Sequence, residues 1–379
     1  MEVFIDVFGF SRGAAQARTF CTWLDAFFQG DRLAGVRAHI RFVGLFDTVS
    51  AAGVGASVTS FTDGHQGWGD APYMRIPARV RHCEHYAAMH ENRSAFPLED
   101  IRQEGVMPPR TRQFRFPGMH SNVGGGYSPL DQGRGPGRQD SEKLSQIPLN
   151  RMFEAAVAAK VPLNKRLAIE QSRWDCYAIA PSLQKAYDEF VSANGAGGRR
   201  MKDCLMDYLT WRIRVRDYFA QLPATLRASE NDRADLIGAN TTLIKDYADV
   251  QAAATIDKRL ADAEKKHSAI SSNHGEIDSL RKEKKRLRSA MSSLSATAAE
   301  VVSRANAWRQ LTLAEHTLFA EYCHDSYAGF KPYEAPLAVG VDLPGTWEPE
   351  GYLRYRVRFE GNDTRLTQIP PQDTQTMVT

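Results

Sequence analysis

Short apolar runs separated by polar and helix-forming stretches characterise the first third of the chain. Residues 2–8 are β-branched and aromatic and lead into GFSRGAA at 9–15, which predicts a strand, a sharp turn and a helix in that order. Continuous apolar runs at 40–49 and 113–119 predict two more central strands. We predict helical or irregular structure between the strands, including 82–92, and this β-α-β succession indicates an α/β fold with a mostly parallel sheet.

Helix formers dominate the second half of the chain, from about residue 174 to residue 319. Within 256–301 apolar residues recur every seven positions along two seams, a spacing typical of a coiled coil. The second seam changes its offset at 271–275, which also carries a turn signal, so we predict an antiparallel helical hairpin, with one long helix as the alternative. Alternation at 351–359 predicts a further strand.

The composition of the 379-residue chain, 42% hydrophobic and 25% charged, is that of a soluble globular protein. A net charge of +3 is close to neutral at this length, so the whole molecule is not expected to bind nucleic acid. The five cysteines form no CxxC pair and no metal-ligand spacing, so neither a zinc site nor a disulfide framework is expected. No signal-peptide pattern or long apolar stretch is present, which predicts synthesis in the cytoplasm and no membrane span.

The segment Gly9-Phe10-Ser11-Arg12-Gly13 matches the pattern G-x-S-x-G, in which a serine nucleophile occupies a strained turn between a strand and a helix. Glycines two positions either side of Ser11 are expected because side chains there would collide with neighbouring backbone. The backbone N–H of Arg12, at the start of the helix, is then placed to stabilise an oxyanion. The alternative is a tight turn with an N-capping serine.

A serine nucleophile needs a base and an acid, which follow it along the chain in the order acid, then histidine, in α/β hydrolases. Asp47 ends the second strand and His120 ends the third, so these two residues are the predicted acid and base. Asp47 could instead be a turn or N-cap residue. Three glycines shortly after His120 indicate unusual backbone angles or a close approach to another group; they are Gly124, Gly125 and Gly126.

Four other histidines are rival bases: His82, His85, His90 and His324. His324 is the strongest of them, because it is followed by Asp325 and Ser326 after a long helix. A helix-terminal histidine explains it equally simply.

Six sequence blocks resemble the α/β-hydrolase domain of bacterial type VI secretion phospholipase effectors, the first class of the type VI lipase effectors. The blocks keep their order along the chain, so the resemblance is specific. They are GFSRGAA at 9–15, VGLFDTV at 43–49, HYAAMHENRSAFPL at 85–98, FPGMHSNVGGGY at 116–127, IPLNRMFEAA at 147–156 and HDSYAGF at 324–330.

The resemblance implies the same roles for Ser11, Asp47 and His120, and hydrolysis of an acyl ester of glycerophospholipids with A1 or A2 specificity and without a cofactor or metal. It also implies an antibacterial toxin injected into the periplasm of a rival cell, with a phospholipid membrane surface, a type VI delivery protein and a cognate immunity protein as partners. The basic run at 281–288 could face anionic lipid, although the solvated face of a coiled coil is the simpler explanation.

The sequence patterns and the resemblance together divide the chain into four parts. We expect a partial α/β-hydrolase core at 1–165, a helical cap or membrane-contacting module at 166–320, a return segment at 321–362 that packs on the core, and a disordered tail at 363–379.

Two departures from the family pattern qualify these expectations. Asn122 stands where the family usually has aspartate, and the chain begins only ten residues before Ser11, whereas the family opens with further strands. We therefore expect an open edge at the first strand. Three explanations are open: a truncated or split gene product, an alternative start, or pairing with a separately encoded N-terminal half as a further partner. A catalytically incomplete interaction module and a small-molecule carboxylesterase are the alternatives.

Overall fold

The structure is a computed structural model of the whole chain. Of its 379 residues it describes 2–50, 73–93, 96–103, 105–164, 176–194, 199–269, 274–293, 297–307, 309–330, 351–354, 356, 358–359 and 365–366.

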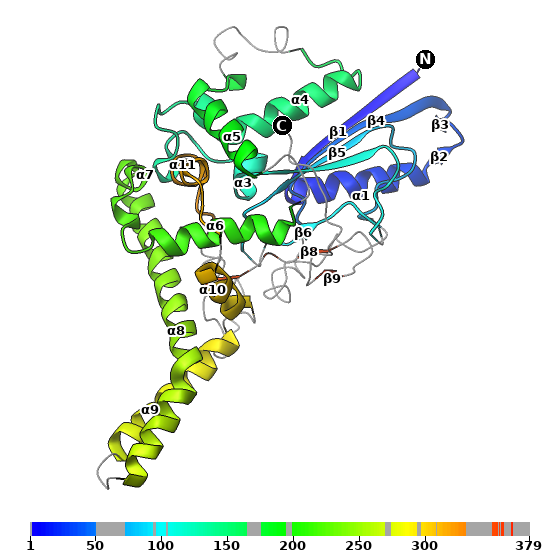
Figure 1. Cartoon of the computed structure of the whole chain (residues 1–379). Coiled ribbons are helices and arrows are strands. Elements are labelled where there is room, and N and C mark those ends of the chain that lie inside the picture. Colours follow the sequence, from blue (N-terminus) through cyan, green and yellow to red (C-terminus); the bar gives the residue numbers. More distant parts are fainter. Residues whose placement is uncertain are drawn as a thin grey trace, which may run out of the picture.

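A mostly parallel sheet lies at one side of a mixed α/β fold, and most of the helices lie on the other (Figure 1). Its strands are β1 (Glu2–Phe10), β2 (Phe28–Gln29), β3 (Arg32–Leu33), β4 (Val36–Phe46), β5 (Cys83–Ala88) and β7 (Thr111–Phe116). Strands β1, β4, β5 and β7 are parallel and lie side by side in that order. The hairpin of β2 and β3 extends the sheet beside the start of β4. The strands predicted at 2–8, 40–49 and 113–119 are thus confirmed.

The prediction of helical or irregular structure at 82–92 is wrong, because this segment contains β5, a central strand. All six residues of β5 are buried although two of them are polar. Hydrogen bonds resolve the conflict: His85 binds Thr48 and Gln113, while Glu84 accepts from Tyr86. Because Thr48 and Gln113 come from other segments, the local sequence resembles a surface helix rather than a buried strand.

Helices cover both faces of the sheet. On one face α1 (Arg12–Ala26) packs Ala14, Ala17 and Cys21 against Val43 and Leu45 of β4. On the other face α4 (Gln146–Ala158) packs beside Phe42 and Tyr86. The alternating side chains of β4 therefore serve two cores, one on each face.

The second half of the described chain is helical and shares the α4-side core with the sheet. Its helices are α5 (Pro181–Asn194), α6 (Met201–Val215), α7 (Pro223–Arg227), α8 (Glu230–Ala269), α9 (His274–Ser293), α10 (Thr297–Ala307) and α11 (Leu313–Glu321). Residues of α5, α6, α8, α10 and α11 belong to the same hydrophobic cluster as residues of β5 and β7. These helices and the sheet therefore share one continuous hydrophobic core.

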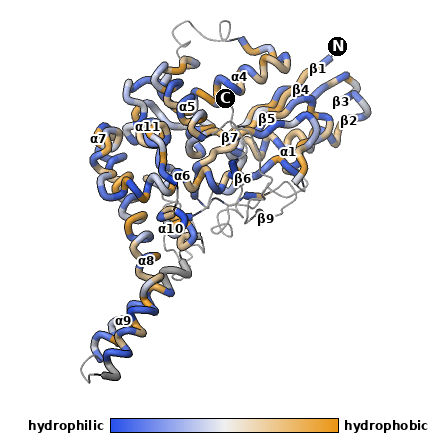
Figure 2. Tube along the Cα trace, viewed as in Figure 1, coloured by the Kyte–Doolittle hydropathy of each residue, from blue (hydrophilic) through white to orange (hydrophobic). Residues whose placement is uncertain are grey.

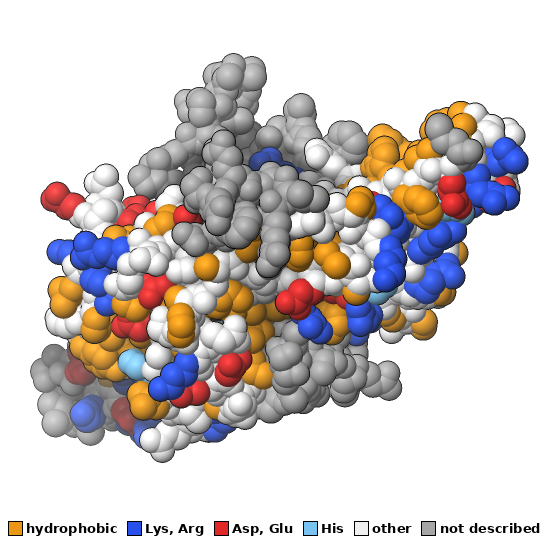
Figure 3. Space-filling model, turned by 90° about the horizontal axis from the view of Figure 1, so that it is seen from above, with side chains coloured by type: hydrophobic (Ala, Val, Ile, Leu, Met, Phe, Trp, Pro, Cys, Tyr) orange, Lys and Arg blue, Asp and Glu red, His pale blue; other side chains and the backbone are white. Residues whose placement is uncertain are grey.

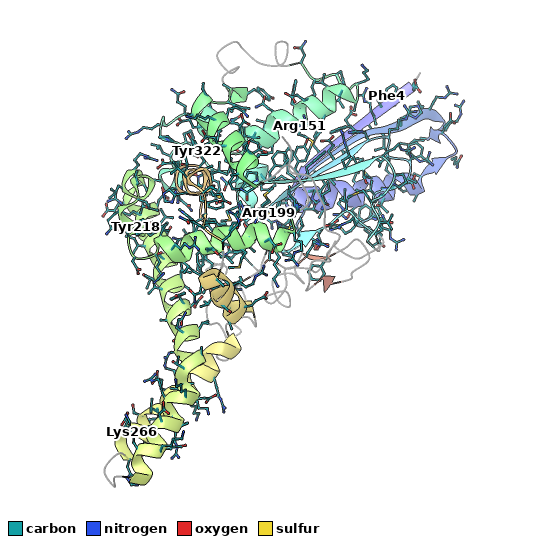
Figure 4. The ribbon with its side chains drawn as sticks, viewed as in Figure 1. Phe4, Arg151, Arg199, Tyr218, Lys266 and Tyr322 are labelled. Carbon is teal, nitrogen blue, oxygen red and sulfur yellow. The ribbon has the colours of Figure 1, made fainter. Side chains whose placement is uncertain are left out.

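Helices α8 and α9 pack against each other through an apolar seam and project from the body of the molecule, with Lys266 near the tip (Figures 2 and 4). The seam consists of Ile256, Ala263, Ile277, Leu280 and Leu287. Ion pairs join later residues of α9 to earlier residues of α8, so the two helices are antiparallel; the pairs include Arg281–Glu264, Lys284–Asp257 and Arg286–Asp249. Much of the basic run at 281–288 is thus paired within the protein.

A second, small sheet joins distant parts of the chain. It contains β6 (Leu98–Glu99), β8 (Arg358–Phe359) and β9 (Arg365–Leu366), in that order. The strand predicted at 351–359 is wrong for Gly351–Arg354, where the chain bends and the N–H of Tyr352 binds Asp246. Most of the tail at 363–379, for which we predicted disorder, lies outside the described residues.

No helix in the described part of the chain is both long enough and apolar enough to cross a membrane.

Arg18 of α1 connects this helix to the loop after β6. Its guanidinium is fully buried and donates to the carbonyl oxygens of Met74 (2.6 Å), Glu99 (2.8 Å) and Asp100 (3.1 Å). We expect Arg18→Met to lower the free energy of unfolding by about 3 kcal/mol or more, because it removes three buried hydrogen bonds from a charged donor. Chemical denaturation measures the loss; Gln16→Met, an exposed position of the same helix, is the control and should change stability by less than about 0.5 kcal/mol.

Candidate active site

Ser11 occupies the sharp turn between β1 and α1. Its backbone angles, φ 57° and ψ −124°, lie in a region that residues other than glycine rarely adopt. The turn is held because the Ser11 N–H donates to Phe46 O (2.9 Å) and the Val49 N–H donates to Ser11 O (3.3 Å). The serine is therefore fixed beside the carboxyl end of β4.

The two glycines of this turn differ in their surroundings, and only one of them is required by the space around it. A Cβ on Gly9 would lie 2.3 Å from the carbonyl oxygen of Gly13, so only glycine fits at position 9. A Cβ on Gly13 would meet nothing within 4 Å. The collision expected from the sequence is thus confirmed for Gly9 and wrong for Gly13. Arg12 is the first residue of α1, where backbone N–H groups have no partner within the helix.

Asp47 and His120 are in direct contact. Asp47 follows β4 and is fully buried; His120 follows β7 and begins the short helix α3 (His120–Gly124). His120 Nδ1 lies 2.6 Å from Asp47 Oδ2, and the Ala88 N–H donates to Asp47 Oδ1 (2.8 Å). The structure therefore brings the predicted acid and base together at the carboxyl ends of the parallel strands, next to the turn that carries Ser11.

Aromatic side chains and a second carboxylate surround His120. Phe10, the neighbour of Ser11, has its ring centroid 4.5 Å from that of His120, and Phe96 contacts the imidazole at 4.9 Å. The backbone N–H of His120 donates to Glu91 Oε2 (3.2 Å), and Glu91 is itself paired with Arg93. Contacts thus hold both the ring and the backbone of His120 in place.

The three glycines after His120 have the features predicted for them. A Cβ on Gly124 would overlap the ring of Phe10, with atoms 1.9 Å apart. Gly125 and Gly126 have φ values of 86° and 118°, in the region that favours glycine. Close approach at Gly124 lets Phe10 lie against the segment that carries the histidine.

Arg356 is a site residue that our sequence analysis missed. Its Nη1 and Nη2 donate to Asp47 Oδ1 and Oδ2, both at 2.8 Å, across 309 positions of sequence. A signal was available in the sequence GYLRYRVRF at 351–359. There Arg354, Arg356 and Arg358 alternate with tyrosine and valine, and arginines buried in such a segment need hydrogen-bond acceptors, of which a carboxylate is one.

Burial and charge set the protonation of the pair. Burial opposes ionisation of Asp47, but the charge of Arg356 and the hydrogen bonds from His120 and Arg356 outweigh it and hold the pKa of Asp47 well below its usual value. Burial lowers the pKa of His120, and its hydrogen bond to Asp47 offsets this only in part. At neutral pH the acid is therefore ionised and the base is neutral.

The rival histidines bind other partners. Burial lowers the pKa of His85 to about 4, and its ring binds Thr48 and Gln113. Burial likewise lowers the pKa of His90 to about 3, and its Nδ1 accepts the Gly118 N–H (2.9 Å). The Nε2 atom of His82 lies 3.3 Å from Oε1 of Glu84.

His324 lies beneath the α3 segment and is bound to Asn122. Its Nδ1 is 2.8 Å from Asn122 Nδ2, its N–H donates to Asn122 Oδ1 (3.1 Å), and its ring stacks on Tyr127 with centroids 3.6 Å apart. These contacts anchor α3, the short helix that begins with His120, to His324. Asn122, the departure from the family pattern, thus has a defined structural partner.

Within the described residues no group of three or more His, Cys, Asp or Glu side chains could hold a metal ion.

Comparison with protein families supports the resemblance seen in the sequence. Residues 27–155 match the catalytic domain of Tle1-like phospholipase effectors of the type VI secretion system, which confirms that resemblance. The matched segment includes Asp47 and His120 and begins after Ser11. Among curated proteins, none matches this chain.

Two solved structures are similar to this chain. An uncharacterized protein from Pseudomonas aeruginosa matches 96% of the chain with a TM-score of 0.62 and 21% sequence identity, and the match spans only 57% of that protein. The Tle1 effector bound to the VgrG spike from the Type 6 secretion system matches 53% of this chain and 53% of its own, with a TM-score of 0.36 and 19% identity. The similarity to the Pseudomonas aeruginosa protein shows that the two chains share a fold.

The geometry of the turn predicts different responses at its two glycines. Gly9→Ala forces backbone atoms of the turn apart, so we expect it to lower the free energy of unfolding by about 2 kcal/mol or more. Gly13→Ala adds a methyl group in open space within a helix, so we expect unchanged or slightly higher stability, by up to about 1 kcal/mol. Thermal unfolding of the two variants measures the difference; equal losses would contradict this account of the turn.

Proposed function

We propose that the chain is a serine-dependent phospholipase with an α/β-hydrolase-like fold, in which Ser11 is the nucleophile, His120 the base and Asp47 the acid. The observation that carries the proposal is the 2.6 Å contact between Asp47 and His120 at the carboxyl ends of the parallel strands, beside the strained turn of Ser11. This arrangement contains the parts that acyl transfer needs: a serine on a strained turn, a neutral histidine and an ionised acid.

The reaction would proceed in two halves. Ser11 Oγ bonds to the acyl carbon of the ester while its proton passes to His120 Nε2, and the carbonyl electrons move onto oxygen, where the Arg12 N–H donates. Collapse breaks the ester C–O bond, and the leaving alcohol takes the proton from His120. Water then repeats the sequence on the acyl-enzyme and releases the fatty acid. Asp47 keeps the Nδ1–H tautomer of His120 throughout.

The match of residues 27–155 to phospholipase effectors supports a phospholipid as substrate. The bond that we propose is cleaved is the acyl ester of a glycerophospholipid, with A1 or A2 specificity. We further propose that the protein acts as an antibacterial effector: it is made in the cytoplasm, carried by a type VI delivery protein into the periplasm of a target cell, and neutralised in its producer by an immunity protein. A small-molecule carboxylesterase would use the same three residues and differ in its acyl pocket.

Helices α8 and α9 are proposed as a coiled-coil hairpin of a helical cap that approaches the phospholipid surface. Ion pairs within the protein engage Arg281, Lys284 and Arg286, which favours a solvated face for the basic run over direct contact with lipid head groups. Any membrane contact by this module would therefore rely on other residues.

One observation favours the second candidate function, half of a split enzyme or an interaction module. Among the described residues β1 pairs with β4 alone, and three of its apolar side chains are more than a third exposed. They are Val3, Phe4 and Phe8, and Figure 3 shows hydrophobic side chains beside basic ones over this end of the sheet. An open edge with apolar side chains suits pairing with a further strand, which a separately encoded N-terminal half could supply.

Activation of Ser11 separates the two functions. We expect a fluorophosphonate probe to label the wild-type chain at Ser11, because a neutral base beside an ionised acid activates the hydroxyl, and we expect Ser11→Ala to abolish the labelling. Peptide mass spectrometry locates the label, and release of fatty acid from phospholipid vesicles should fall by at least about 1,000-fold in the variant. Equal fatty-acid release by both proteins would rule out the serine mechanism; no labelling at all would favour the interaction module.

The pH dependence of hydrolysis follows from the pKa of His120. The reaction needs the neutral imidazole, which predominates above its pKa, and burial places that pKa below the ordinary value of 6.5. We therefore expect kcat/KM to fall on acidification with a midpoint below pH 6.5, while Asp47 stays ionised throughout. A pH profile on a soluble short-chain ester measures the midpoint; a value above 6.5 would contradict the assignment of His120 as the base.

A further inference from the structure

We propose that Arg356 is a positioning residue of this site: it holds the Asp47 carboxylate and the Phe96 segment in the places from which both contact His120. The inference rests on the proposed function, because it gives Arg356 a role in the same site. It also makes the segment around 351–359 a structural part of the active centre.

Three hydrogen bonds from one rigid group support the inference. Nη1 and Nη2 of Arg356 bind the two oxygens of Asp47 at 2.8 Å each, and Nε donates to the carbonyl oxygen of Phe96 (2.6 Å). A planar guanidinium that binds both oxygens fixes the plane of the carboxylate as well as its position. Since the Arg356 side chain is only 3% exposed, water does not compete freely for these bonds.

Both groups that Arg356 holds touch the imidazole of His120. Asp47 Oδ2 lies 2.6 Å from Nδ1, and the ring of Phe96 lies 4.9 Å from the imidazole, centroid to centroid. The remaining ring contact, Phe10, belongs to β1 and does not depend on Arg356. Among the described residues, two of the three contacts to the His120 ring thus involve groups that Arg356 binds.

The charge of Arg356 also affects the protonation of the base. The charged groups that influence His120 are Asp47 from the end of β4, Glu91 after β5 and Arg356 from the segment before β8. The two carboxylates favour the imidazolium, and Arg356 opposes it. Asp47 can therefore orient the imidazole while the base remains neutral, the form that accepts a proton from Ser11.

A purely structural role for Arg356 is the competing explanation, because any buried carboxylate needs a cation. Arg358 provides the matched control: it is 2% exposed, lies two residues further along, and faces Asp100 at 3.7 Å rather than Asp47. Loss of either arginine should reduce stability, but only loss of Arg356 should alter His120.

The titration of His120 tests this difference without any need for catalysis. We would record the imidazole nitrogens by NMR in protein labelled with ¹⁵N-histidine and assign His120 with a His120→Gln variant. We expect Arg356→Met to shift the titration midpoint of His120 by about one pH unit, because it removes a nearby positive charge and also releases the Asp47 carboxylate that binds the imidazole. Arg358→Met should leave that midpoint unchanged. Equal midpoints in Arg356→Met and wild type would overturn the proposal.

If Arg356→Met does not fold, the Arg356→Lys variant is measured in its place. Lysine keeps the positive charge but not the planar fork, so the midpoint of His120 should remain near the wild-type value. The rate of fluorophosphonate labelling at Ser11 should nevertheless fall, by up to about 100-fold, because the base is less well oriented. A labelling rate equal to wild type across the pH range would contradict the positioning role.

The two measurements separate this inference from the proposed function. A chain that fails to label at Ser11 but shows the expected shift of the His120 titration in Arg356→Met would refute the serine mechanism and support the role of Arg356. A chain that labels at Ser11, with the same rate and titration in Arg356→Met as in Arg358→Met, would support the enzyme and refute that role.

Discussion

The buried carboxylate of Asp47 is the constraint on which the arrangement of the site depends. A charged group with no exposure to solvent is stable only when its oxygens are fully hydrogen-bonded and its charge is balanced. Here the donors come from the end of β5, from α3 and from Arg356, so one side chain ties together segments that are far apart in the sequence. The sheet supplies the first two because parallel strands end at a common edge.

The helical half of the chain contributes to the same network from the other side. Arg212 of α6 donates to the hydroxyl of Tyr352 (3.0 Å), which donates in turn to Asp325 (2.8 Å). The next residue, Ser326, donates to Glu91 (3.0 Å), the carboxylate that accepts the backbone N–H of His120. Through these bonds the helices hold both the segment that leads to Arg356 and the backbone of the base.

Buried polar groups, rather than apolar packing alone, explain where local interpretation of the sequence failed. The segment that contains β5 has few apolar residues in succession, yet its polar side chains are satisfied by Thr48, Gln113 and Arg112 from neighbouring strands and loops. The bend at Gly351–Arg354 depends similarly on Asp246 of α8. Partners so distant in sequence leave no periodic signal in the segment itself.

The sequence by itself determined the strand, turn and helix around Ser11 and three of the four parallel strands, and it nominated Asp47 and His120, which the structure brings into contact. Those features follow from local patterns: apolar runs, glycines required by the backbone, and polar residues that directly follow strands. Only the tertiary structure decided that β5 is a central strand, that His324 binds Asn122 and not Asp47, and that Arg356 binds the carboxylate of Asp47. The physical reason is that a buried charge selects its partners by proximity in the folded chain, which spacing along the sequence does not specify.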